Sequence, residues 1–232
     1  MSAVRFVLVR PRNPLNIGAC ARALANFGFS DLLAVDPFEA VWKETKSAVG
    51  GEAVLEKARA VSLDEALDDR QVVLGTHDGR RKSGPPVVDL PELRAWLPSG
   101  RLAVLFGPEK TGLANEELSR CHAVLRIPTD AGCPSMNLAQ AVAVVAYELK
   151  RAPGKAGKET LDPTTHGQRE DLIKSAVSLC RKMHVKDDLT DSSLADGFRR
   201  LLLRWTMSGG EAARLQLLLR RLNDPEISSK AR

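Results

Sequence analysis

The chain has 232 residues, of which 44% are hydrophobic and 27% charged, with a formal net charge of +5. These values are typical of a water-soluble globular protein, and the length allows one main domain with a small appendage. The first ten residues contain only a short apolar run interrupted by Arg5, and the apolar stretch from Leu138 to Leu149 is too short to cross a bilayer. We therefore expect a cytoplasmic protein without a signal peptide or a membrane span.

The excess of positive charge lies in the C-terminal third of the chain. Residues 1–150 carry 18 basic and 18 acidic side chains, whereas residues 151–232 carry 16 basic and 11 acidic ones. Such a basic extension suits contact with a polyanion, although a solvated helical surface produces the same charge pattern. The four cysteines are scattered without metal-ligand spacing, which favours reduced thiols and no bound metal.

Short runs rich in valine, leucine and isoleucine alternate with helical patterns along the first 150 residues. The predicted strands are 4–9, 31–35, 71–75, 102–106 and 123–127, and the predicted helices are 16–27, 52–69, 90–97, 113–120 and 136–151. This alternation predicts an α/β fold with a mostly parallel sheet and helices on both faces. Near-continuous apolarity at 102–106 is typical of a strand buried on both sides.

The sequence predicts three consecutive parts: a domain at 1–152, a linker at 153–167 and a helical extension at 168–232. The linker is rich in proline, glycine, lysine and threonine and lacks periodicity. After it, helical patterns cover 168–184, 191–207 and 210–223. Because three short helices bury little surface alone, we expect them to pack on the main domain or on a second subunit.

Three segments combine glycines with a few polar side chains, and each follows a predicted strand and opens a helical pattern. They are residues 13–22, 106–113 and 127–139. Parallel sheets place ligands at the carboxyl ends of their strands, so we expect these segments to form one site. The first strand is not followed by G-x-G-x-x-G, and the glycine- and lysine-rich stretch at 154–160 lacks the spacing of a P-loop.

The polar residues of these segments also have purely structural explanations. Asn16 lies at the mouth of a predicted helix, where free backbone amides favour an anion. Arg22 has small neighbours and suits a phosphate or ribose contact, or it lies along the surface of its helix. Glu109 is either a site carboxylate or a partner of a helix dipole. Ser135 is expected to cap the helix that follows it.

Taken together, the segments resemble the three motifs of the SpoU/TrmH-type branch of the SPOUT superfamily, which are RNA ribose 2′-O-methyltransferases. The residues that match those motifs are Asn16, Gly18, Ala19, Arg22 and 26–28 for motif one, Phe106, Gly107, Glu109, Gly112 and Leu113 for motif two, and Ile127, Pro128 and 135–139 for motif three. Within the branch the sequence is most similar to the TrmJ type, which modifies nucleotide 32 in the anticodon loop of tRNA. Gly50–Arg59, Gly75-Thr76 and the helical extension support this narrower resemblance.

The resemblance implies a homodimeric enzyme that transfers the methyl group of S-adenosylmethionine to an RNA ribose 2′-hydroxyl. It also implies that the sheet ends in a trefoil knot that holds the methyl donor. The implied catalytic residues are Arg22, Asn16, Glu109, Asn137 and Ser135. The implied contacts with the methyl donor are Thr76, His77, Asp78, Gly107, Ile127, Pro134, Ser135 and Met136. The residues expected to bind RNA are Arg22, Arg199, Arg200, Arg204, Arg214, Arg220 and Arg221.

The sequence departs from the family pattern at two positions. Gly75-Thr-His-Asp-Gly-Arg80 stands where the family commonly has Gly-Thr-Ser-Ala-Arg, and Met136 replaces a leucine. The first change displaces Arg80 by one residue and adds the Asp78 carboxylate near a cationic sulfonium. A non-catalytic RNA-binding protein with a degenerate cofactor pocket is therefore a second hypothesis, and methylation of ribosomal RNA is a third.

Overall fold

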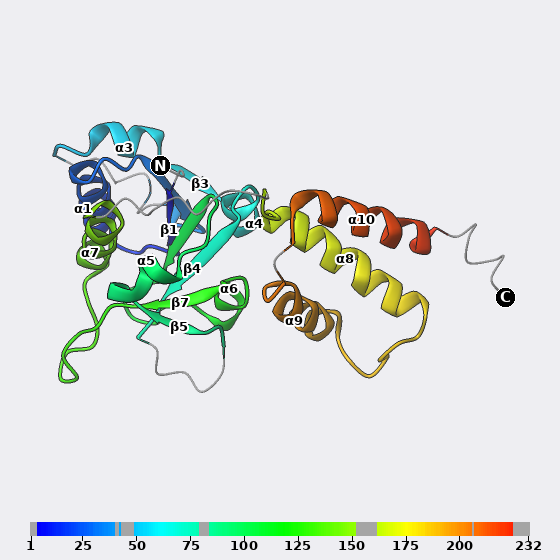
Figure 1. Cartoon of the computed structure of the whole chain (residues 1–232). Coiled ribbons are helices and arrows are strands. Elements are labelled where there is room, and N and C mark those ends of the chain that lie inside the picture. The colour runs from blue at the N-terminus through cyan, green and yellow to red at the C-terminus, as the bar shows by residue number, and fades with distance from the viewer. Residues whose placement is uncertain are drawn as a thin grey trace. The chain divides into compact units, whose positions relative to one another are not determined.

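The computed structural model describes residues 4–39, 42, 49–78, 84–151, 162–205 and 207–224. The chain forms two compact units (Figure 1). Unit 1 comprises Met1–Leu67 and Val72–Lys158, and unit 2 comprises Asp68–Gln71 and Glu159–Arg232. Unit 2 therefore includes four residues from the first third of the chain, which no pattern in the sequence indicates.

Unit 1 is built on a seven-stranded sheet with the order β3-β2-β1-β6-β4-β7-β5, in which every pair of neighbours is parallel. The strands are β1 (Val4–Val9), β2 (Asp31–Val35), β3 (Arg59–Val61), β4 (Val72–Thr76), β5 (Val87–Asp89), β6 (Leu102–Phe106) and β7 (Ala123–Arg126). The predicted parallel α/β fold is confirmed, and the sequence predicted the five inner strands. The two strands that it missed are three residues long and lie at the sheet edges.

Short helices connect the strands of unit 1. They are α1 (Pro14–Asn26), α3 (Glu52–Lys57), α4 (Leu63–Leu67), the 3₁₀ turn η1 (Leu90–Glu92), α5 (Leu93–Trp96), α6 (Asn115–Ser119) and α7 (Leu138–Arg151). The prediction of one helix over 52–69 was wrong, because β3 separates α3 from α4. Ala58 is extended, with φ −66° and ψ 140°, and the next three residues pair with β2. This tertiary pairing overrides the helical propensity of the segment.

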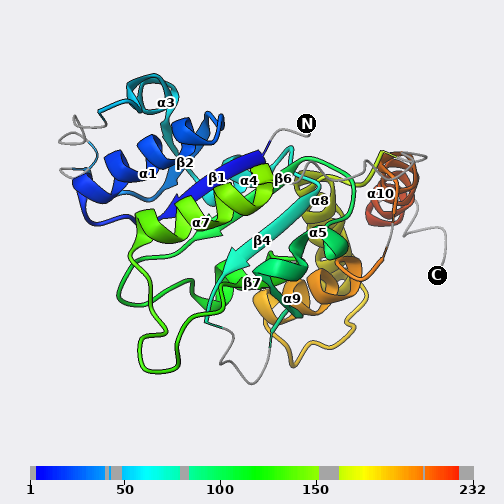
Figure 2. The same ribbon diagram turned by 60° about the vertical axis from the view of Figure 1, so that its left-hand side comes forward.

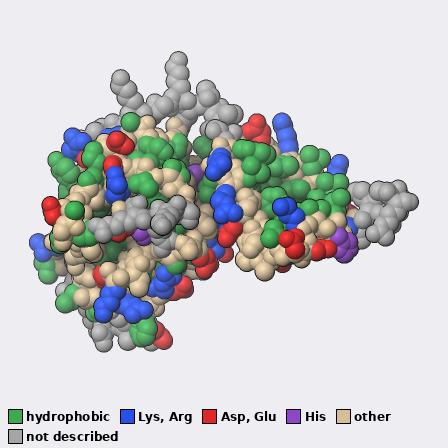
Figure 3. Space-filling view, turned by 90° about the horizontal axis from the view of Figure 1, so that it is seen from below, with side chains coloured by type: hydrophobic (Ala, Val, Ile, Leu, Met, Phe, Trp, Pro, Cys, Tyr) green, Lys and Arg blue, Asp and Glu red, His purple; other side chains and the backbone are tan. Residues whose placement is uncertain are grey.

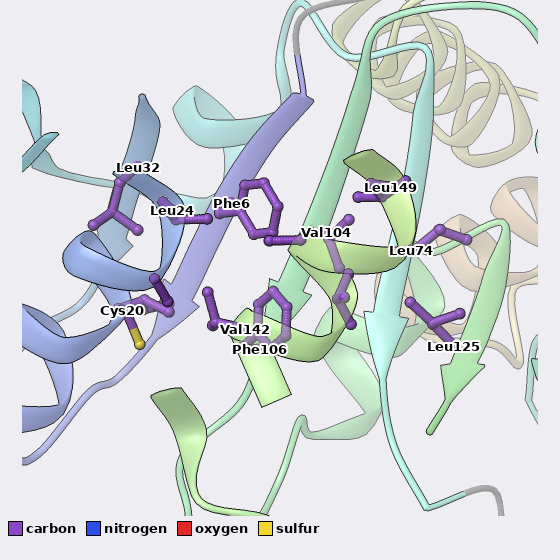
Figure 4. Close-up of a cluster of buried hydrophobic side chains, with 14 of the residues drawn as sticks. Phe6, Cys20, Leu24, Leu32, Leu74, Val104, Phe106, Leu125, Val142 and Leu149 are labelled. Atoms are coloured by element: carbon purple, nitrogen blue, oxygen red, sulfur yellow. The ribbon is translucent and has the colours of Figure 1, made fainter. Parts of the chain in front are cut away.

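Side chains on successive strand positions pack into two cores on opposite faces of the sheet. Phe6 and Phe106 belong to the larger core, where their rings stack with centroids 6.1 Å apart. Cys20 of α1 and Val142 of α7 pack into the same core (Figure 4). Val7 of β1 belongs to the other core, which is covered by α4 and α6. Because both faces are covered, the inner strands are apolar throughout, as the sequence indicated.

Helices α1 and α7 lie side by side on the same face of the sheet (Figure 2). The end of α7 is held by Arg94 of α5, whose guanidinium donates to the carbonyl oxygens of Glu148 and Leu149 at 2.6–3.2 Å. A positive charge is favourable at a helix C-terminus, where carbonyl groups lack partners within the helix. This contact fixes the position of α7, whose first turn contributes to the candidate site.

Unit 2 contains three helices, α8 (His166–Lys182), α9 (Asp191–Leu202) and α10 (Gly209–Asn223). They enclose a small core of Leu172, Ile173, Leu202 and Ala212. Helix α8 begins two residues earlier than predicted because Thr165 caps it: its hydroxyl accepts from the Gln168 amide at 3.2 Å. Helix α9 ends five residues earlier than predicted. Most of the predicted linker, residues 153–161, lies outside the described residues.

The buried Arg169 connects parts of unit 2 that are far apart in sequence. Its guanidinium donates to the carbonyl oxygens of Thr164 at 2.6 Å and of Gln71 at 3.2 Å. Burial lowers the pKa of Arg169 to about 10, so the side chain remains charged at neutral pH.

In the part of the chain that the structure describes, no helix is both long and apolar enough to cross a membrane.

Candidate active site

The first segment of the candidate site begins with a capped helix. The Asn13 side chain accepts a hydrogen bond from the Leu15 amide at 3.0 Å, and Pro14 occupies the first helical position. Proline suits that position because it has no amide to leave unpaired and its φ is already helical. Helix α1 thus starts two residues earlier than predicted. Asn16 lies inside its first turn, so its side chain is not needed as the cap and points to other partners.

Asn16 connects all three polar segments. Its side-chain nitrogen donates to Oε1 of Glu109 at 2.5 Å, and its oxygen accepts from the side-chain nitrogen of Asn137 at 3.2 Å. These partners follow β6 and β7, 93 and 121 residues away along the chain. The expectation that the segments meet at the carboxyl ends of the strands is confirmed for these three side chains. We call Asn16, Glu109 and Asn137 the polar network.

Asn137 also begins helix α7. Its side-chain oxygen accepts from the amides of Ala139 at 2.9 Å and Gln140 at 3.4 Å. The prediction that Ser135 caps this helix was wrong, because α7 starts at Leu138 and Asn137 is the residue immediately before it. Ser135 is exposed and lies two residues before the cap. The cap leaves the Asn137 amide free to reach Asn16, so one side chain serves both the helix and the network.

The loop after β6 depends on two glycines. Gly112 has φ +64° and donates from its amide to the Pro108 carbonyl at 2.8 Å, which closes the loop into a tight turn. A Cβ on Gly107 would lie 2.3 Å from the backbone nitrogen of Leu113, far inside contact distance. Any larger residue at Gly107 would therefore open the turn. The closed turn holds Glu109, half-buried, beside Asn16.

The end of β4 borders the same loops. The Thr76 hydroxyl donates to the Leu105 carbonyl at 3.0 Å, and the His77 amide donates to the Leu125 carbonyl at 3.2 Å. Nδ1 of His77 lies 2.7 Å from Oδ1 of Asp78. Thr76, His77 and Asp78 thus lie where β4 ends between β6 and β7. The displaced Arg80 lies outside the described residues.

The third segment forms an ordered loop between Ile127 and the network. The Thr129 hydroxyl donates to the Pro134 carbonyl at 3.1 Å, and the Cys133 amide donates to the Asp130 carbonyl at 3.0 Å. Ile127 is half-buried against the larger core, whereas Ser135 is exposed and Met136 half-buried. Backbone groups and small side chains therefore dominate this edge, which suits a ligand recognised largely through main-chain contacts.

Arg22 is exposed on α1, six residues beyond Asn16, and Asn26 is exposed one turn further on. A residue that sequence reasoning did not single out is Glu52, the first residue of α3, which follows the point where Gly51 packs against the backbone of Arg22. The adjacent pair Gly50-Gly51 was the available signal, since it permits close approach of two helices.

The six arginines expected to bind RNA differ in their surroundings within unit 2. Arg199 is only 12% exposed and forms two hydrogen bonds to Glu170, at 2.7 and 2.8 Å, and one to Asp196 at 2.6 Å. It connects α9 to α8 rather than facing solvent. The other five are exposed, and they are Arg200, Arg204, Arg214, Arg220 and Arg221.

An all-parallel sheet with three loops converging at the carboxyl ends of its strands defines an α/β protein with a ligand site at that edge. The polar network and the glycine-closed loop narrow this class of α/β proteins to the SpoU-type methylases, because they bring together the three motifs of those enzymes. The chain belongs to the SpoU rRNA Methylase family, whose model matches residues 3–147.

Named relatives and solved structures agree with the family. The chain is 40% identical over 207 residues to the tRNA (cytidine/uridine/adenosine-2′-O-)-methyltransferase TrmJ of Pseudomonas aeruginosa, covering 84% of this chain and 80% of that protein. It is 37% identical over 152 residues to an uncharacterized tRNA/rRNA methyltransferase of Haemophilus influenzae, spanning 64% of this chain and 63% of that protein.

The crystal structure of TrmJ from Zymomonas mobilis (Z. mobilis ZM4) is similar over 95% of this chain and 99% of its own, with a TM-score of 0.80 and 27% identity. An AdoMet-bound rRNA methyltransferase from Sinorhizobium meliloti matches 64% of this chain and 56% of its own, with a TM-score of 0.50 and 26% identity.

Proposed function

We propose that this protein transfers the methyl group of S-adenosylmethionine to a ribose 2′-hydroxyl of tRNA, at nucleotide 32 of the anticodon loop. The observation that carries the proposal is the polar network, because it joins the three motifs at one point of unit 1. The TrmJ relatives, whose names specify tRNA 2′-O-methylation, support tRNA over other RNAs. A tRNA substrate in turn fits a cytoplasmic enzyme.

The loops at the ends of β4, β6 and β7 fit the methyl donor. Gly107 closes its loop with no room for a side chain, and it stays half-exposed where β6 ends. The residues that would hold the donor are Thr76, His77, Asp78, Gly107, Ile127, Pro134, Ser135 and Met136. When bound, S-adenosylmethionine supplies an electrophilic methyl group and a neutral thioether leaving group, so its departure calls for no metal. The contact between His77 and Asp78 gives the Asp78 carboxylate a partner near the expected sulfonium.

The residues of this chain then have to orient the ribose and help its hydroxyl lose a proton. Asn16, Glu109 and Asn137 hold the start of α1 against the two loops, and Ser135 precedes Asn137 by two residues. Arg22 would hold its guanidinium near the hydroxyl and stabilise the negative charge that develops on the oxygen. It does not act as an unassisted base, because a guanidinium stays protonated in proteins.

We further propose that unit 1 is the catalytic domain, that it ends in a trefoil knot and that the enzyme is a homodimer. The knot is supported by α7, which returns to pack beside α1 although β7 lies on the far side of β4. The homodimer is supported by two exposed hydrophobic side chains on these helices, Leu15 at 68% and Tyr147 at 52% exposure. An experimental structure that traces the chain from β4 to β5 would show whether unit 1 is knotted. The molecular mass from sedimentation would show whether the protein is a dimer.

Unit 2 is proposed to hold RNA through its five exposed arginines, whereas Arg199 has a structural role. Figure 3 shows hydrophobic side chains gathered on unit 2 with Lys and Arg among them. Among the exposed hydrophobic side chains of unit 2 are Trp205 and Leu218, at 53% and 57% exposure. The surface therefore offers both charge for phosphate groups and apolar area for a protein contact. An RNA-binding measurement can decide between these two roles of unit 2.

The test is to incubate the protein with radiolabelled S-adenosylmethionine and either tRNA or rRNA lacking 2′-O-methylation, and then to map the label. Label on an anticodon-loop ribose supports the proposal as stated. Label on rRNA keeps the chemistry and changes the substrate. Binding of the methyl donor without any transfer would favour the non-catalytic alternative.

A further inference from the structure

The start of α3 packs directly against the backbone of α1 at Arg22. A Cβ on Gly51 would lie 2.5 Å from the backbone nitrogen of Arg22 and 2.7 Å from its Cα. Real Cβ atoms do not approach other atoms so closely, so a larger residue at position 51 would displace α3. The preceding Gly50 has φ +80°, a conformation that glycine adopts without strain. Two adjacent glycines thus place Glu52, the first residue of α3, beside the backbone of α1 at Arg22.

The carboxylate of Glu52 is held by its own turn rather than by Arg22. Its Oε1 accepts a hydrogen bond from the Gly50 amide at 3.0 Å. Hydrogen bonds from its own amide and from that of Gly50 lower the pKa of Glu52, and the positive charge of Arg22 lowers it further against slight desolvation. Its place in the first turn of α3 also favours a negative charge. The Glu52 carboxylate is therefore an anion whose position does not depend on the rotamer of Arg22.

Arg22, in contrast, has little to restrain it along α1. Its neighbours Ala19, Ala21 and Ala23 are small, and the side chain is exposed. A free arginine side chain loses rotamer entropy when it is ordered, so an unrestrained Arg22 would be in the productive orientation only part of the time. A nearby anchored anion reduces that loss by favouring the rotamers that face it.

We propose that Glu52 is a positioning residue for Arg22, which it holds in the orientation that meets the ribose hydroxyl. The inference deepens the proposed function and rests on it for the role of Arg22. A simple surface ion pair is the competing explanation, and it would affect stability slightly and leave kcat unchanged. Glu56 provides a matched control, because it is exposed on the same helix one turn further on and carries the same charge.

The experiment compares Glu52→Gln and Glu56→Gln in the full-length protein. Glu52→Gln keeps an oxygen that accepts from the Gly50 amide and removes the charge. We expect it to lower kcat about two- to five-fold at low ionic strength, with KM for S-adenosylmethionine unchanged. The loss should shrink at high salt because an exposed pair is screened. Glu56→Gln should match the wild type. Equal kcat for the two variants, or a loss that ignores salt, would overturn the proposal.

A measurement on the RNA-free protein separates this proposal from the methyltransferase assignment. The side-chain Nε–Hε signal of Arg22, assigned in an NMR spectrum with Arg22→Lys, reports how ordered the guanidinium is. We expect Glu52→Gln to shift this signal and to lower its order parameter, and Glu56→Gln to leave both unchanged. An unaltered Arg22 signal in Glu52→Gln disproves the pairing. If the wild type shows no transfer while the signal shifts, the pairing stands and the proposed reaction fails.

Discussion

At the scale of single residues, the candidate site shows how common side chains acquire specific roles by their partners. Asn13 and Asn137 are both helix caps, yet Asn137 also donates to Asn16 and so links α7 to α1. Cys20 lies beneath the same region, where burial and the charge of Glu109 raise the pKa of its thiol. The thiol is therefore neutral at physiological pH and is a packing group rather than a nucleophile.

Arg22 provides the sharpest test at this scale. We expect Arg22→Ala to keep the binding of S-adenosylmethionine within about twofold and to lower kcat by roughly 100-fold or more, because it removes charge stabilisation only from the ribose oxygen that accepts the methyl group. Calorimetric titration and single-turnover transfer to tRNA measure the two quantities. A folded Arg22→Ala protein that no longer binds the methyl donor would contradict the assigned role.

At the scale of elements, loops carry much of the site, and their shape depends on backbone conformation. The turn from Gly107 to Gly112 holds Glu109 against α1, and the capped starts of α1 and α7 present the two asparagines. Helix α6 is attached in a similar way: Glu117 accepts a hydrogen bond from Arg10 at 2.5 Å, and the Ala114 amide bonds its other oxygen.

Gly107→Ala tests the loop. The added Cβ would meet the Leu113 backbone, and relieving this overlap costs about 1 to 3 kcal/mol. If the loop opens, affinity for S-adenosylmethionine should fall roughly five- to 150-fold. Gly210→Ala in unit 2 is the control, because nothing lies within 4 Å of its added Cβ. Unchanged affinity in Gly107→Ala would remove this loop from the donor site.

The ion pair between Glu117 and Arg10 predicts a pH dependence of stability. Burial alone would raise the pKa of Glu117, but hydrogen bonds from Arg10 and Ala114 outweigh it and the net pKa is lowered. A carboxyl whose folded pKa lies below its unfolded value contributes stability above the unfolded pKa, and the contribution is lost as pH falls through the folded pKa.

We therefore expect the free energy of unfolding to decrease as pH falls below about 4.5, and Glu117→Gln to flatten this decrease. Urea titrations between about pH 3 and 7 provide the measurement. Parallel curves for the variant and the wild type would show that other carboxylates dominate acid unfolding.

At the scale of the whole molecule, the chain divides into an α/β unit with 20 basic and 16 acidic side chains and a helical unit with 14 basic and 13 acidic ones. Some of the basic side chains in residues 151–232 form ion pairs within unit 2, as Arg199 does with Glu170 and Asp196. The remaining exposed arginines give unit 2 its proposed affinity for RNA phosphates.

Replacing Arg214, Arg220 and Arg221 by Gln in the full-length protein tests this affinity. Each phosphate contact that is lost should reduce the slope of log affinity against log salt by about 0.7 to 0.9. The matched variant with Lys at the three positions should keep most of the slope because it keeps the charge. An unchanged slope in the Gln variant, measured by filter binding, would indicate that this face of α10 serves a protein contact instead.

The sequence by itself determined the parallel α/β architecture, the inner strands and the three motif segments. Strand burial, glycine placement and local spacing depend on residues that are close together in the chain, so the sequence pattern predicts them. Even the meeting of Asn16, Glu109 and Asn137 followed from the rule that parallel strands end at one edge. The tertiary structure alone decided the edge strands β3 and β5 and the membership of Asp68–Gln71 in unit 2. It also brought Glu52 to Arg22 and paired Arg199 with Glu170. These features depend on contacts between residues far apart in the chain, and such contacts leave no local pattern in the sequence.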